Sequence, residues 1–165
     1  MLDLLVFAPC QRVVVDEDEK LTSMLILLEA IDITKDSDFP VDAVVPMSWN
    51  LLCLWHRSAP VEKDIIFEQR VDVIRPDGER VGGSEVKFTV TNEFRNFRNR
   101  IRMDGFPVGI VGEHILRLSI REAGEENEWR QVATYPVLVR HKEVAVTEEK
   151  GADGEKSGTE ATEVH

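Results

Sequence analysis

The chain has 165 residues, of which 42% are hydrophobic and 31% charged, and its formal net charge at pH 7 is −11. This balance is that of one ordinary globular domain and excludes a chain that is disordered throughout or one that spans a membrane. The excess of carboxylates also argues against general binding of DNA or RNA, because nonspecific affinity depends on cations that neutralise phosphates.

The N-terminal segment, Met1 to Cys10, carries no basic residue ahead of its apolar run, and Asp3 interrupts that run. A secretory signal has a positive start followed by a continuous apolar region, so we expect no export and a cytoplasmic location. The two cysteines of the chain, Cys10 and Cys53, are accordingly expected to be reduced thiols. Cys53 lies in an apolar segment and is predicted to be a small core residue.

Strand candidates in the first half of the chain are short apolar segments separated by polar residues. They comprise residues 4–7, 13–15, 21–33 and 47–55. The last is apolar at nearly every position, which predicts a central strand that is buried on both faces. The third also fits a helix, because Leu21, Met24 and Leu28 share a helical spacing, but we favour a strand.

The middle of the chain alternates apolar and polar side chains with a period of two, which is typical of half-buried strands. One such run covers residues 65–74 and a second covers 85–90. Between them, Pro76-Asp77-Gly78 favours a tight turn, so the two runs are predicted to form a hairpin. Gly82-Gly83 indicates a bulge or a bend in its second arm.

Two further alternating runs, 114–121 and 135–140, complete a set of eight or so short strands. Their spacing of about ten residues, without helical segments between them, predicts two packed sheets. We expect one domain, residues 1–142, folded as an all-β, antiparallel β-sandwich that is immunoglobulin-like or related. Residues 143–165 carry seven carboxylates, two lysines and almost no large apolar side chain. Such a segment is expected to be a disordered acidic tail with a net charge of −5.

Several turn and strand motifs carry a resemblance to a known family. They are Phe7-Ala8-Pro9-Cys10, Pro46-Met47-Ser48-Trp49, Phe67-Glu68-Gln69-Arg70 with Pro76-Asp77-Gly78, and Gly105-Phe106-Pro107 with Gly112-Glu113-His114. Over about residues 3–141 the chain resembles a family of uncharacterised bacterial proteins without an assigned function. The resemblance implies a β-sandwich and no activity, and it carries over no functional residue. The last motif also resembles the corner before a late strand of immunoglobulin-like domains, with His114 where this bacterial family has tyrosine.

The one concentrated basic segment of this acidic chain contains Arg98, Arg100 and Arg102, here named the arginine row. If the segment is a strand, the three arginines share one face and apolar residues share the other. Three guanidinium groups in a row suit phosphate, an acidic peptide of a partner, or the protein's own acidic tail. The alternative is pairing with carboxylates of a neighbouring strand, such as Glu85 or Glu68.

Patterns for catalysis or metal binding are weak in this sequence. Three histidines, His56, His114 and His141, fall near the ends of predicted strands, but neither a nucleophile elbow nor a local Cys-His pair accompanies them. His114 is predicted to be a corner or core histidine. The acidic run at 16–19 lacks the glycine and glutamate of an EF-hand loop, and we expect no metal and no cofactor. Trp129, in a polar setting, allows a carbohydrate platform as an alternative to a structural role.

These observations predict a non-enzymatic protein-interaction or structural module that contacts partners through strand edges and the arginine row. The sequence allows a protein partner, predicts neither general nucleic-acid binding nor membrane contact, and leaves the oligomeric state open. The alternative is a small-ligand-binding protein or weak hydrolase with a pocket around His56 or His114. A deep pocket lined by these histidines and a carboxylate favours that alternative, whereas filled sheet faces favour the interaction module.

Overall fold

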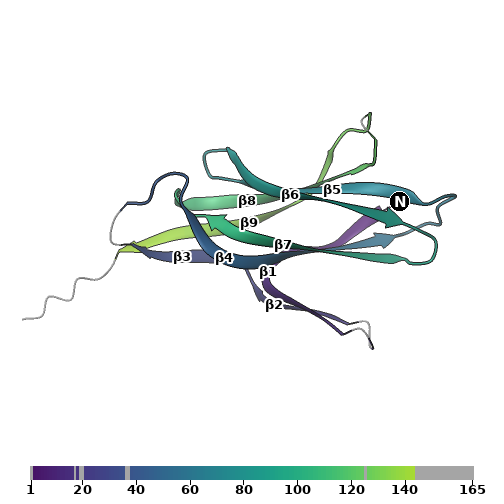
Figure 1. The fold of residues 1–165 in the computed structure, drawn as a ribbon, viewed down its shortest axis with the longest axis horizontal. Helices are drawn as coiled ribbons and strands as arrows, with labels where there is room; N and C mark the ends of the chain where they lie inside the picture. The colour runs from purple at the N-terminus through teal and green to yellow at the C-terminus, as the bar shows by residue number, and fades with distance from the viewer. Residues whose placement is uncertain (1, 17, 19–20, 36–37, 125, 144–165) are drawn as a thin grey trace, which may run out of the picture.

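The structure is a computed structural model that describes residues 2–16, 18, 21–35, 38–124 and 126–143. These residues form nine β-strands and no helix (Figure 1). The strands are β1 (Leu2–Val15), β2 (Thr22–Leu27), β3 (Ala30–Lys35), β4 (Val44–Arg57), β5 (Ile65–Ile74), β6 (Arg80–Val90), β7 (Asn96–Pro107), β8 (Gly112–Glu122) and β9 (Arg130–Glu143). Within this part of the chain there is accordingly no helix with the length and apolarity to cross a membrane. Residues 144–165, which hold nearly all of the predicted acidic tail, lie outside the described residues.

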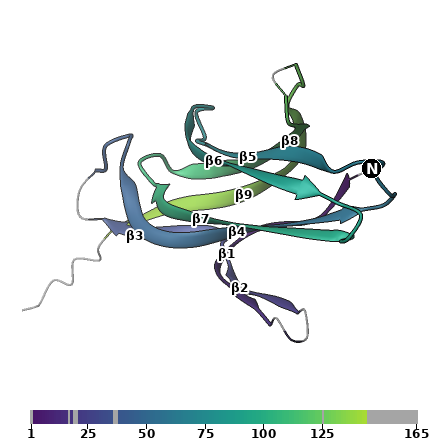
Figure 2. The same ribbon diagram turned by 45° about the vertical axis from the view of Figure 1, so that its right-hand side comes forward.

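The strands form two facing sheets, which confirms the predicted all-β, two-sheet architecture (Figures 1 and 2). The first sheet has the order β2-β1-β4-β7 and is antiparallel throughout. The second has the order β3-β9-β8-β5-β6, and in it β3 runs parallel to β9. The predicted antiparallel arrangement is therefore found in every strand pair of the described residues except this one.

The parallel pair arises where the chain passes from the first sheet to the second without a turn. The amide of Leu28 donates to the carbonyl of Pro9 in β1, whereas the carbonyl of Glu29 accepts from the amide of Leu138 in β9. Two successive residues thus bond to different sheets, and β3 continues in the direction of β2. The prediction of a strand and not a helix for residues 21–33 is confirmed. The segment forms two strands, however, and they lie in two different sheets.

The hairpin predicted for the middle of the chain is formed by β5 and β6. Its turn is closed by Arg75, whose amide donates to the carbonyl of Glu79 over 2.9 Å, and Gly78 adopts a φ of 88° that favours glycine. The register shifts between Val73 and Ile74, so the bulge indicated by Gly82-Gly83 is present beside it. A Cβ on Gly83 would lie 2.4 Å from the carbonyl oxygen of Val71, which explains why a glycine is needed there.

The core lies between the two sheets and is built on β4, whose Trp49 and Trp55 are buried as predicted. One polar side chain, Gln69, is buried with them and is satisfied: its Oε1 accepts from Trp55 Nε1 over 2.8 Å and from Asn99 over 2.9 Å. Its Nε2 donates to the sulfur of Cys53 over 3.2 Å. Burial raises the pKa of the Cys53 thiol to about 12, so this cysteine is an inert core group.

Candidate basic docking surface

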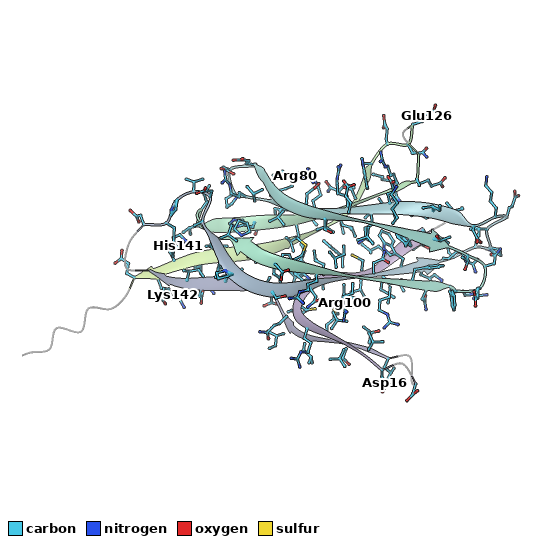
Figure 3. The ribbon with its side chains drawn as sticks, viewed as in Figure 1. Asp16, Arg80, Arg100, Glu126, His141 and Lys142 are labelled. Atoms are coloured by element: carbon cyan, nitrogen blue, oxygen red, sulfur yellow. The ribbon has the colours of Figure 1, made fainter. Side chains whose placement is uncertain are left out.

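The arginine row lies on the outer face of β7, an edge strand of the first sheet. All three arginines are exposed, and the intervening Asn99 and Ile101 turn inward, so the predicted division of faces is confirmed. In the register with β4, Arg100 lies beside Leu52, which belongs to a small apolar cluster with Cys10 and Val13 on the outer face. Figure 3 shows Arg100 on the side from which the β1–β2 hairpin projects.

The predicted alternative, in which the arginine row pairs with Glu68 or Glu85, is wrong. Glu68 lies in the second sheet and binds Lys87 over 2.7 Å and Arg121 over 2.6 Å. Glu85 lies opposite Arg70 in the β5–β6 register. Both glutamates therefore belong to a sheet that does not contain β7, and sequence alternation alone does not reveal which strands become neighbours.

The arginine row is almost free of internal partners. Arg102 approaches Asp104 at 3.4 Å, but both side chains are more than 70% exposed, and such contacts contribute little. Among the described residues, Arg98 and Arg100 make no ion pair and no side-chain hydrogen bond. Alternate residues of a strand are about 6.6 Å apart, so the row presents an extended, regularly spaced line of positive charge.

The outer face of the second sheet also carries arginines, but these are paired. Asp72, only 1% exposed, contacts Arg80 at 2.6 Å, Arg117 at 3.1 Å and Arg70 at 3.5 Å, and we name this group the Asp72 cluster. The guanidinium carbons of Arg70 and Arg121 lie 4.4 and 4.5 Å from the centre of the Trp129 ring. These contacts give Trp129 a structural role beside the Asp72 cluster.

The Asp72 cluster could not be predicted from the sequence, because its members come from different strands. Arg70 and Asp72 lie on β5, Arg80 on β6 and Arg117 on β8. The sequence did carry one signal: in each alternating run the charged residues occupy the outward positions, which places them on one sheet face. Without the strand order, nothing in the sequence indicated that one carboxylate would contact three arginines.

The histidines do not converge on a common point. His56 donates from Nδ1 to Asn96 Oδ1 at the beginning of β7, over 2.9 Å. His114 lies on β8 and is fully buried. Its ring lies 5.6 Å from the ring of Phe106, which is near the end of β7. Burial lowers the pKa of His114, so it is a neutral core histidine. His141 donates from Nε2 to the carbonyl of Val108.

A cavity of about 670 Å³ opens between the edge strands β6 and β7. Its lining includes Gly82 and Gly83 of β6, Arg102 and Met103 of β7, and the buried Trp49. No histidine contributes to this lining. Among the described residues, no group of three or more histidine, cysteine, aspartate or glutamate side chains is arranged to hold a metal ion.

Comparisons with known proteins leave the chain without a family. No family model matches it, and no curated protein matches it. Among solved structures, the N-terminal domain of PorA is similar over 83% of this chain and 98% of that domain, with 11% sequence identity and a TM-score of 0.27. This structural similarity is weak.

Proposed function

We propose that the protein is a non-enzymatic protein-interaction module whose contact surface is the arginine row together with the free edge of β7. The observation that carries the proposal is the exposure of Arg98 and Arg100 without an internal carboxylate partner among the described residues. Elsewhere on this acidic molecule, arginines such as Arg117 and Arg121 are held by buried carboxylates. Positive charge left without a partner on a net negative protein favours a binding role.

The partner that fits this surface is an extended segment with carboxylates at alternate positions. β7 is hydrogen-bonded to β4 alone among the described strands, so its outer edge offers backbone donors and acceptors to an added strand. Side chains on one face of the added strand lie level with the arginines, where opposite charges stabilise cross-strand pairs. Its other face lies level with apolar residues such as Ile101 and Met103.

The acidic tail is proposed to compete for the same surface. Residues 143–165 carry a net charge of −5, which is opposite to that of the arginine row. A tethered segment acts at a high effective concentration even when its intrinsic affinity is low. Replacing the seven tail carboxylates by their amides is therefore expected to strengthen the binding of an acidic peptide.

The direct test uses a labelled peptide of alternating glutamate and valine and measures fluorescence anisotropy with the full chain. The variant Arg98→Ser/Arg100→Ser/Arg102→Ser is expected to weaken binding about tenfold, in line with the loss of three exposed ion pairs. The matched control Arg12→Ser/Lys63→Ser/Arg130→Ser removes the same charge from other exposed positions and is expected to retain binding. Equal affinities of the two variants, or equal binding of a serine–valine peptide, would contradict the proposal.

Small-ligand binding is a second candidate, favoured by the cavity between β6 and β7, whose volume falls within the range of small-molecule sites. A Cβ on Gly82 would meet only the side chain of Val73, at 4.0 Å, so a Cβ fits there without a clash. The variant Gly82→Phe is expected to lower the fluorescence of bound 1-anilinonaphthalene-8-sulfonate. Unchanged dye binding would remove this candidate.

We also propose a cytoplasmic location and membership of an uncharacterised bacterial family of immunoglobulin-like or related sandwiches. Cys10 and Cys53 are both free and buried, as expected for a reducing compartment. Packing of Phe106 on His114 supports the corner seen in immunoglobulin-like domains.

A further inference from the structure

The hairpin of β1 and β2 projects from the body of the sandwich (Figures 1 and 2). Its base is anchored by Met24, which packs on the cluster of Cys10, Val13 and Leu52. Its tip is acidic, and there the amide of Asp18 donates to the carboxylate of Asp16 over 3.0 Å. The hairpin is therefore an anchored element of the fold, and its outer strand, β2, is the edge of the first sheet.

The edge formed by β2 is apolar and unusually exposed. Its sequence, Thr22–Leu27, contains no ionisable residue, and five of its six residues are exposed. Leu25, Ile26 and Leu27 are 45%, 71% and 46% exposed. Adjacent apolar side chains of the same hairpin, Val14 and Leu21, are exposed as well. Large apolar side chains that gather at one exposed edge mark an interaction surface.

The other three sheet edges differ from β2 because they carry charges. β7 has the arginine row, β6 has Arg80, Glu85 and Lys87, and β3 has Asp32 bound to Arg140 and Lys142. Charged side chains on an edge strand oppose pairing with a strand that lacks complementary charge. β7 can therefore accept a strand with carboxylates, whereas β2 can pair with an uncharged strand such as its own copy.

Backbone strain at Ile26 is a second, independent observation. Its φ of 58° lies in the left-handed region, and it is the only residue other than glycine with positive φ in the described part of the chain. A β-branched side chain in this conformation is a genuine outlier, and such strain gathers at functional sites. Among the described residues, Ile26 also has the most exposed large apolar side chain.

We propose that β2 pairs with β2 of a second copy, antiparallel about a two-fold axis, so that two four-stranded sheets become one continuous eight-stranded sheet. An uncharged strand meets no like charge when it pairs with itself. The antiparallel arrangement sends the acidic tips of the two hairpins, at Asp16 and Asp18, to opposite ends, whereas a parallel one would bring them together. The acidic tail does not fit this edge, because residues 144–165 contain three valines and no larger aliphatic side chain.

The test is the oligomeric state of the full chain, measured by sedimentation velocity from about 1 to 100 μM. We expect a dimer that Leu25→Lys weakens by at least about tenfold, because paired strands then bring two lysines close together. The matched control Ile66→Lys changes a side chain of similar exposure on β5, away from any edge, and is expected to leave the dimer unchanged. Circular dichroism verifies that each variant is folded.

A second variant separates the contact from the fold. Ile26→Gly relieves the strained φ and removes the exposed side chain, so it is expected to raise the midpoint of unfolding of the monomer while weakening the dimer. A wild-type protein that is monomeric at the highest concentration would overturn the proposal, even if a strand of another protein binds β2. So would a dimer that Leu25→Lys and Ile66→Lys affect equally. The triple serine variant of the arginine row should dimerise like the wild type.

Discussion

The two outer faces of this molecule use arginine in opposite ways. On the second sheet, Arg70, Arg80 and Arg117 contact a carboxylate that is almost completely buried, and Trp129 packs on Arg70 beside them. On the first sheet, the arginine row projects from an edge strand, and its one ion pair within the described part of the chain is the exposed contact of Arg102 with Asp104. The first arrangement stabilises the fold, whereas the second leaves its charge available to another molecule. A test of these two roles of arginine must therefore separate effects on stability from effects on binding.

The largest effect is expected for Asp72→Ala. Removal of this carboxylate leaves three guanidinium groups without their shared partner, and Arg70 and Arg117 are only 26% and 35% exposed. Because solvent screens these arginines in part, we expect a loss of about 2 to 3 kcal/mol in the free energy of unfolding, toward the low end for broken buried pairs. Guanidinium chloride denaturation followed by tryptophan fluorescence measures the loss.

The matched control for this prediction is Asp104→Ala on the first sheet. Asp104 contacts Arg102 at 3.4 Å with both side chains exposed, so its removal is expected to cost less than about 0.5 kcal/mol. Similar losses for Asp72→Ala and Asp104→Ala would show that the contrast between the two faces is wrong.

A smaller loss, about 1 kcal/mol, is expected for Trp129→Ala, which removes the ring that contacts Arg70 and Arg121. Thermal unfolding monitored by circular dichroism measures it. Phe94→Ala serves as a comparison, because Phe94 is 56% exposed and its ring makes no aromatic or cation–π contact in the described part of the chain. If Phe94→Ala destabilises the protein as much, the contacts of Trp129 are not what stabilises this face.

Glu68 makes the stability of the second sheet depend on pH. Hydrogen bonds from Lys87 and Arg121 lower the pKa of Glu68 below its ordinary value of 4.5. The resulting stabilisation is fully present above the ordinary pKa and is lost as the pH falls from there through the lowered pKa of the folded state. Urea denaturation between about pH 6 and 3 should show a shallower decline for Glu68→Gln than for the wild type. Identical pH profiles would mean that Glu68 contributes no such linkage.

Much of the fold was predictable because side-chain alternation records which face of a strand is buried. The inward positions of Trp49 and Trp55, the β5–β6 hairpin and the shared face of the arginine row all follow from local sequence. The parallel position of β3 does not, because alternation says nothing about which strand becomes a neighbour. Its placement depends on the passage between sheets at Leu28 and Glu29.

The candidate surfaces were predictable only in part, for the same reason. Arginines of the arginine row and arginines such as Arg117 occupy similar alternating sequence patterns. Strand order decides which of them lies beside a carboxylate. The apolar run Leu25–Leu27 resembles a core strand in sequence, yet the structure leaves it exposed at an edge. Exposure and pairing are tertiary properties, so they become visible only when the sheets are assembled.

The smallest effect on stability is expected for the triple serine variant of the arginine row. Among the described residues, Arg98 and Arg100 have no ion pair or side-chain hydrogen bond to lose. The formal net charge becomes more negative by three, and ordinary salt screens the added repulsion between exposed charges. We expect the free energy of unfolding to stay within about 0.5 kcal/mol of the wild-type value in guanidinium chloride denaturation. A loss of about 2 kcal/mol would place the arginine row in the same class as the Asp72 cluster. Weaker peptide binding by this variant would then reflect a damaged fold and would no longer support a docking role.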